Sequence, residues 1–134
     1  LVNKHSLRNS VSFIGRIQYK DLPGYICVGD IFAMPSRSRF AGLEVEGLGI
    51  VYLEASACGL PIVSTLHAGI PEAVIQDETG ILVQVSDFKA MGEALISLAN
   101  EPTLRIKMGE SARKHMLKNY EIKTQAEKLR GLLQ

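Results

Sequence analysis

Several features that would assign a chain to a broad class are missing from this sequence. No apolar run approaches about 18 residues, so no transmembrane helix is expected. The first residues, 1–5, have neither the charged nor the apolar region of a signal peptide. No internal repeat or low-complexity segment occurs, and cysteine and histidine do not recur at metal-ligand spacing. Neither a membrane span nor a metal site is therefore predicted.

Cysteine is scarce, and its placement favours reduced thiols. Cys27 and Cys58 both lie in apolar segments with helical character. Two buried free thiols in a reducing compartment are favoured over a disulfide, which indicates a cytoplasmic location. No Ser-His-Asp or Cys-His arrangement can be assembled, and His67 is interpreted as a polar loop residue.

The composition is that of an ordinary globular domain. The 134 residues are 46% hydrophobic and 22% charged, enough for one domain at most. The net charge is +1, but residues 1–100 contain seven basic and ten acidic side chains, whereas residues 101–134 contain eight and four. No dense polybasic cluster is present, so the basic C-terminal part is interpreted as solvated helix faces, and no nucleic-acid partner is expected.

Short apolar segments alternate with helical patterns along the chain, which predicts an α/β fold with a parallel sheet. Strands are expected at residues 11–15, 31–34, 61–65 and 81–83, and helices at 22–28, 49–58, 72–75, 87–100, 102–118 and 120–133. Ligands of such sheets bind beyond the carboxyl ends of the strands. Three segments that follow strands are expected to share that edge: residues 16–17, 36–48 and 67–69.

The most informative stretch runs from Glu46 to Gly59. Two glycines open it, an apolar run follows, and Gly59 with Pro61 ends it, which predicts a helix from about residue 49 to 58. The helix has almost no polar face and is expected to be buried nearly all round. Glu54 inside this run is anomalous, because a buried carboxylate needs a donor or a ligand.

The residues at the start of this helix predict a ligand with two kinds of group. Gly47 and Gly49 allow close approach to the backbone, and the first N–H groups of the helix have no intrahelical partner. Such a helix start favours an anion, typically a phosphate. The flanking carboxylates, Glu46 and Glu54, suit hydroxyl groups instead. A phosphate flanked by polyhydroxylated groups describes a sugar nucleotide.

The same residues resemble a known signature. Glu46 and Glu54, separated by seven residues with Gly-x-Gly between them, are similar to the motif of retaining glycosyltransferases of family 4. Further segments match the family in order, namely residues 11–16, 30–36, 69–74, 78–83 and 108–113. The resemblance implies a GT-B fold, in which two Rossmann-like domains enclose the active site. The run 42–56 is most like bacterial mannosyltransferases that act on phosphatidylinositol.

The resemblance also implies roles for individual residues. Glu46 would be the catalytic residue that holds the donor sugar, and Glu54 would bind the ribose. Arg16 and Ile17 would line the nucleobase pocket. Four residues would act through backbone N–H groups on the diphosphate and sugar: Gly47, Leu48, Gly49 and Ile50. No metal or cofactor is implied beyond the substrate itself, GDP-mannose or, as alternatives, UDP-glucose or UDP-N-acetylglucosamine.

By the same resemblance the chain is a fragment of a larger enzyme. Residues 1–118 would form part of a nucleotide-sugar-binding Rossmann-like domain, and residues 119–134 a helix that packs across to an absent N-terminal domain. The basic pair that grips the diphosphate in the family is not found here, so the fragment alone is expected to be inactive. The acceptor would be a sugar or a lipid, and the parent enzyme cytoplasmic or peripheral at the inner membrane face.

Two other classes of function are alternatives, and the sequence argues against the first of them. A dinucleotide-binding oxidoreductase would need a third glycine where Tyr52 stands and a strand directly before Gly47, and neither condition is met. A non-catalytic Rossmann-like domain that binds a nucleotide or a protein is the other alternative.

Overall fold

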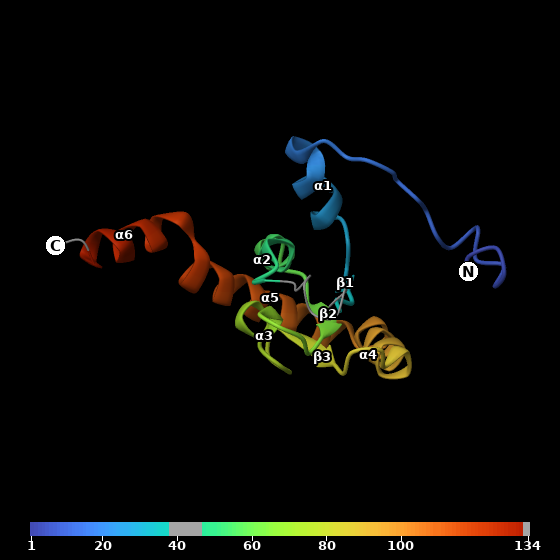
Figure 1. The fold of residues 1–134 in the computed structure, drawn as a ribbon. Helices are drawn as coiled ribbons and strands as arrows, with labels where there is room; N and C mark the ends of the chain where they lie inside the picture. Colours follow the sequence, from blue (N-terminus) through green and yellow to red (C-terminus); the bar gives the residue numbers. More distant parts are fainter. Residues whose placement is uncertain (38–46, 133–134) are drawn as a thin grey trace.

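The computed structural model describes residues 1–37 and 47–132, and within them it has the predicted α/β architecture (Figure 1). A parallel sheet has the order β1-β2-β3, with β1 at Phe32–Met34, β2 at Ile62–Thr65 and β3 at Gly80–Val83. The helical segments are η1 (Tyr19–Asp21), α1 (Leu22–Cys27), α2 (Ile50–Ala57), α3 (Ile70–Ala73), α4 (Phe88–Asn100), α5 (Pro102–Tyr120) and α6 (Ile122–Leu132). Three of the four predicted strands are therefore confirmed.

The core is built on both faces of β2, which is buried along its whole length. Successive strand residues point to opposite faces, so Ile62 and Val63 enter different clusters. Ile62 packs with Tyr52 of α2 and with residues of α3. Val63 packs with Leu98 of α4 and Met108 of α5. Burial on both faces agrees with the absence of charged residues from this strand, whose two polar side chains, Ser64 and Thr65, are both buried.

The C-terminus of α2 is closed as the sequence predicts. Gly59 has φ +74°, its N–H donates to Ser56 O, and the N–H of Leu60 donates to Ala55 O. These two bonds form a Schellman motif, which satisfies carbonyls that the helix itself leaves free. The Arg113 guanidinium of α5 adds a hydrogen bond to the carbonyl of Ala57. The helix is thereby held against α5 at its far end.

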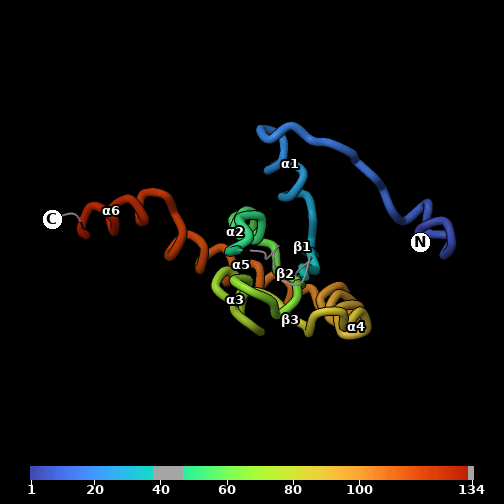
Figure 2. The backbone as a smooth tube through the Cα atoms, viewed as in Figure 1, coloured from blue at the N-terminus to red at the C-terminus, as the bar shows by residue number. Residues whose placement is uncertain are grey.

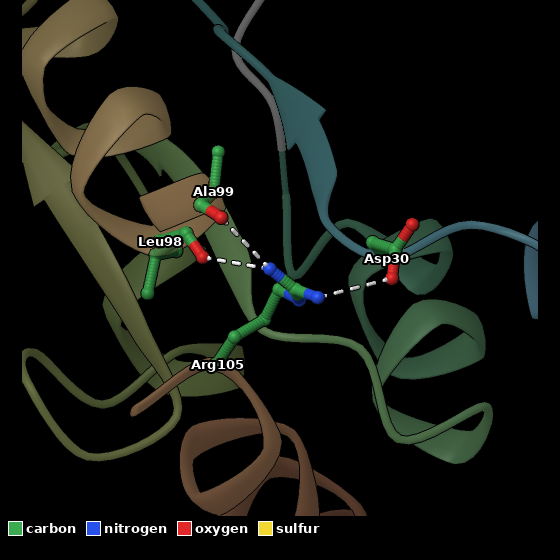
Figure 3. A network of polar contacts seen from close by, with 4 residues as sticks. All are labelled: Asp30, Leu98, Ala99 and Arg105. Atoms are coloured by element: carbon green, nitrogen blue, oxygen red, sulfur yellow. Dashed lines mark hydrogen bonds and ion pairs between the residues drawn. The ribbon is translucent and has the colours of Figure 1, made fainter. Parts of the chain in front are cut away.

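Arg105 of α5 joins its helix to two further segments (Figure 3). Its Nη1 donates to the carbonyls of Leu98, at 3.0 Å, and Ala99, at 3.2 Å, in the last turn of α4. Its Nη2 lies 3.4 Å from the carboxylate of Asp30, just before β1. A cation at a helix C-terminus is favourable, and this one also fixes the start of β1 relative to α4 and α5.

The strand predicted at residues 11–15 is wrong. Residues 11–18 run as an extended segment outside the sheet, and Phe13 is 82% exposed. The N–H of Val11 bonds to Leu7 O within the same segment rather than to a neighbouring strand. A β-strand is stabilised by its ladder partners, and β1 pairs with β2 and not with this segment. Figures 1 and 2 show residues 1–18 leading away from the sheet.

The expectation of two free thiols is also wrong. Cys27 and Cys58 form a disulfide, with Cα atoms 5.0 Å apart. Cys27 is the last residue of α1, and Cys58 caps the C-terminus of α2. Their sequence separation of 31 conceals this proximity, which arises because α1 packs beside α2. Cys27 is exposed and Cys58 half-buried, so neither is the fully buried thiol that was expected.

Two helices carry apolar stripes at helical spacing that are not wholly buried: Phe88, Met91, Leu95 and Leu98 in α4, and Ile122, Ala126 and Leu129 in α6. Phe88 at the start of α4 is exposed, although Met91, Leu95 and Leu98 of the same stripe pack into the core. α6 presents its stripe to solvent within the described structure, with Ile122 84% exposed. Figure 1 shows α6 reaching out beyond the body formed by the sheet and the other helices. Its packing against a further domain, and the boundary at residues 118–119, stay predictions.

Candidate functional site

The N-terminus of α2 is the centre of the candidate site. Gly49 is the N-cap residue and has φ +69°, a conformation that side chains disfavour, which explains the glycine. The helix begins at Ile50 and ends at Ala57, within one residue of the predicted bounds at each end. The N–H of Tyr52 donates to Gly49 O at 2.9 Å. The preceding N–H groups, of Ile50 and Val51, have no acceptor inside the helix and lie at its positive end.

The prediction that α2 is buried nearly all round is wrong. One face, formed by Tyr52, Ala55 and Ser56, is buried. The opposite face is open, and Ile50 is 70% exposed. The apolar sequence could not distinguish the two faces, because it lacks the polar stripe that normally marks the solvent side of a helix.

Glu54 lies on this open face. It follows Ile50 by four residues, so the two side chains are neighbours on the helix surface. Glu54 is half-buried, and within the described part of the chain its carboxylate has no hydrogen-bond or ion-pair partner. The anomaly seen in the sequence therefore remains in the structure: a carboxylate stands on an apolar surface without a protein donor among residues 1–37 and 47–132. Its acceptor oxygens are available to a ligand hydroxyl.

Tyr52 anchors the buried face of α2 to the sheet. Its ring is fully buried, and its hydroxyl lies 3.0 Å from the carbonyl of Met34, at the end of β1. The same hydroxyl lies 2.9 Å from the hydroxyl of Ser64 in β2 and 3.0 Å from that of Ser36. Sequence reasoning missed these residues. The available signal was a polar group at Tyr52 and another at Ser64, each inside an apolar run, which predicts a hydrogen-bonded pair when both are buried.

The loop after β1 is fixed at the same edge. The N–H of Ser36 donates to the Thr65 hydroxyl at 3.0 Å, and that hydroxyl donates to Ser36 O at 2.6 Å. Thr65 is the last residue of β2, so this exchange holds the carboxyl ends of β1 and β2 together. Ser36, the first residue of the loop predicted at 36–48, therefore lies at the carboxyl edge of the sheet, and residues 38–46 of that loop are outside the described residues.

The loop after β2 packs directly on the glycine stretch. A Cβ atom at Gly69 would come within 2.6 Å of the Gly47 carbonyl and 3.4 Å of the Leu48 N. The contact requires a residue without a side chain at position 69, and it places the segment 67–69 beside the start of α2. Two of the three segments expected at this edge are thus brought together.

Three other predicted site residues, Glu46, Arg16 and Ile17, have roles that the described structure does not test. Glu46 lies outside the described residues, so its catalytic role stays a prediction. Arg16 and Ile17 lie in the segment 11–18, which runs outside the sheet, so the structure does not bring them to its carboxyl edge. Their role in a nucleobase pocket likewise stays a prediction. Gly47, Leu48, Gly49 and Ile50 lead into α2, and Glu54 lies one turn beyond Ile50. Gly49 is buried, and the other four form an exposed to half-buried patch at the start of α2.

The described residues contain neither a metal-binding cluster nor a membrane-spanning helix. Within residues 1–37 and 47–132, no group of three or more His, Cys, Asp or Glu side chains is arranged to hold a metal ion. No helix in the same part of the chain combines the length and apolarity that crossing a bilayer requires.

Comparison with known proteins agrees with this geometry. The family described as "Glycosyl transferases group 1" matches residues 1–115. A "GDP-mannose-dependent monoacylated alpha-(1-6)-phosphatidylinositol monomannoside mannosyltransferase" from Corynebacterium glutamicum is 43% identical over 125 residues, covering 93% of this chain and 32% of the relative. A "GDP-mannose-dependent alpha-(1-6)-phosphatidylinositol monomannoside mannosyltransferase" from Mycolicibacterium smegmatis is 43% identical over 123 residues, covering 92% and 32%.

Solved structures show the same fold. The C-terminal domain of a glycosyl transferase group 1 family protein from Francisella tularensis is 26% identical, with a TM-score of 0.78, covering 90% of this chain and 59% of that one. Sucrose-phosphate synthase from Thermosynechococcus elongatus is also 26% identical, with a TM-score of 0.84, covering 98% and 31%.

The parallel sheet with flanking helices is the fold of the C-terminal domain of GT-B glycosyltransferases. The chain belongs to the group 1 glycosyltransferase family. It spans about a third of the length of the curated relatives it matches.

Proposed function

We propose that this chain is the donor-binding part of an enzyme that transfers mannose from GDP-mannose to a lipid acceptor, with retention and without a metal ion. The observation that carries the proposal is the patch at the start of α2. Amides without an acceptor inside the helix, a close-approach glycine at position 69, and a carboxylate without a partner among residues 1–37 and 47–132 lie together around the first turns of α2. That arrangement suits a nucleoside diphosphate sugar.

The proposed chemistry follows from the charges that the reaction develops. Breaking the bond between sugar and diphosphate builds negative charge on the departing phosphate oxygen. The N–H groups of Ile50 and Val51, at the positive helix end, stabilise that charge. Glu54 accepts hydrogen bonds from the ribose hydroxyls and so fixes the nucleoside. Glu46, eight residues earlier in the sequence, holds the hydroxyls of the sugar that is transferred.

The relatives support the choice of donor and acceptor. Both bacterial relatives at 43% identity are described as GDP-mannose-dependent and as acting on a phosphatidylinositol monomannoside. With a lipid acceptor of this kind, we propose that the parent enzyme acts as a peripheral protein at the inner face of the membrane. UDP-glucose is the alternative donor, since a structural neighbour from Anabaena, 20% identical, was solved in complex with it.

Isothermal titration of GDP and UDP into the chain tests the proposal. We expect GDP to bind more tightly than UDP, and Glu54→Gln to weaken GDP binding by roughly tenfold to a hundredfold, because a charged acceptor for the ribose is lost. Glu110→Gln, an exposed carboxylate on α5, is the matched control and should bind as the wild type does.

Each outcome decides a separate part of the proposal. Absence of nucleotide binding by the wild type would contradict the donor-binding function. Undiminished GDP affinity in Glu54→Gln would remove the ribose role alone. Tighter binding of UDP than of GDP would contradict GDP-mannose as the donor and would favour a UDP-sugar.

A further inference from the structure

The Tyr52 hydroxyl makes more polar contacts than its burial alone requires. It lies within 3.0 Å of the Met34 carbonyl, the Ser64 hydroxyl and the Ser36 hydroxyl. The Ser64 hydroxyl in turn donates to Met34 O at 2.7 Å. A hydroxyl has one proton and two acceptor sites, so a consistent assignment exists: Ser36 donates to Tyr52, and Tyr52 donates onward to Met34 or Ser64. The network is then complete.

The hydroxyl is not needed to fill the core. The Tyr52 ring packs edge-to-face on Phe32 at a centroid distance of 6.1 Å, and it belongs to the cluster around Ile62. Phenylalanine would keep this ring packing, and its burial would not require polar partners. The hydrogen bonds of the hydroxyl instead fix the position of the ring relative to the ends of β1 and β2.

Tyr52 is also part of the first turn of α2. Its own N–H closes that turn on Gly49 O, and its immediate predecessors are Ile50 and Val51, whose amides have no acceptor inside the helix. A shift of Tyr52 relative to the sheet therefore moves these amides by a similar distance. The carboxyl end of β1 is held independently, through the exchange of hydrogen bonds between Ser36 and Thr65.

We propose that Tyr52 is a positioning residue of the donor site, whose hydroxyl fixes the first turn of α2 so that its amides are preorganised for the diphosphate. The inference rests on the proposed function for its ligand. Preorganised donors stabilise charge without reorganising when the ligand binds, and a misplacement of about 1 Å can cost a hundredfold. Tyr52 contacts the sheet, not the ligand, and acts through the backbone that it holds.

Tyr52→Phe tests the role against a matched control, Thr79→Val. Thr79 is also fully buried, and its hydroxyl accepts a 2.7 Å hydrogen bond from Ile75 N. It precedes β3, at the amino end of the sheet, away from the site. Both variants lose one buried hydroxyl, so both are expected to lower the melting temperature. Only Tyr52→Phe should weaken GDP binding, by roughly tenfold, from the cost of misplaced groups.

Two further readouts separate positioning from general loss of stability. Guanosine lacks the diphosphate, so its affinity by NMR titration should be equal in Tyr52→Phe and wild type, whereas a loosened fold would weaken guanosine and GDP together. Hydrogen exchange without ligand should rise at residues 49–53 in Tyr52→Phe and not in Thr79→Val.

The outcomes distinguish the two proposals. Equal GDP affinity in Tyr52→Phe and Thr79→Val would overturn the positioning role, as would unchanged exchange at residues 49–53. If the wild type bound no nucleotide, the proposed function would fail, and the claim about the donor site would fail with it.

Discussion

Reduction of the Cys27–Cys58 disulfide is expected to destabilise this chain strongly. The bond joins residues separated by 31 positions and closes a loop that includes β1 and α2. Loop-closure entropy for a loop of this length corresponds to about 4 kcal/mol at 25 °C. A chain of 134 residues has a total stability of roughly 7 to 20 kcal/mol. The cross-link thus supplies a substantial share of the folding free energy.

The weak packing of α1 predicts which part of the chain responds first when the disulfide is reduced. α1 contains no buried residue, so few noncovalent contacts replace the disulfide once it is reduced. Cys27 is exposed, which gives a reductant access in the folded state. We expect α1 to detach first. Hydrogen exchange at residues 22–28 should therefore rise on reduction before the sheet itself opens.

Urea unfolding with and without a thiol-free phosphine reductant measures the effect. With a slope of about 2 kcal/mol/M, a loss of about 4 kcal/mol lowers the midpoint by about 2 M. Cys27→Ser is the control: its midpoint should match that of the reduced wild type and should not respond to reductant. A wild-type midpoint that is unchanged by reductant would refute the reasoning. Detection of two free thiols in protein that was unfolded without reductant would also refute the reasoning.

Three smaller perturbations test other parts of the structure. Gly69→Ala should weaken GDP binding, because its Cβ would lie 2.6 Å from Gly47 O and displace the start of α2; GDP affinity equal to the wild type would contradict this contact. Gly109→Ala should cost about 3 kcal/mol in urea unfolding, since its Cβ would overlap the Gly59 carbonyl where α5 crosses the end of α2. Asp87→Ala should cost about 1 kcal/mol, because the carboxylate accepts from the third N–H of α4; an unchanged urea midpoint would argue against this cap.

Local chemistry made much of the fold predictable. Gly59 with its positive φ ended α2 where expected, and Asp87 capped α4. These signals are local because a helix end depends on the conformation and hydrogen bonds of a few adjacent residues. The sequence of residues 61–65 likewise predicted a strand, which is β2, although its burial along the whole length was not predicted.

Predictions that depended on a contact between distant segments of the chain were less successful. Residues 11–15 have the composition of a strand, but a strand forms only where a neighbouring ladder exists. The pairing of Cys27 with Cys58 depends on two helix ends meeting in space. The network on Tyr52 likewise joins residues from three segments of the chain. In each case the deciding contact is distant in sequence.

The sequence alone determined the kind of site, since glycines, free helix amides and a lone carboxylate follow directly from residue types and their spacing. Only the tertiary structure decided which face of α2 is open, because nothing in an all-apolar helix distinguishes its two sides until one is packed against a sheet. It also decided that the loop holding Gly69 lies on Gly47, since that proximity is created by parallel strands whose carboxyl ends meet at one edge.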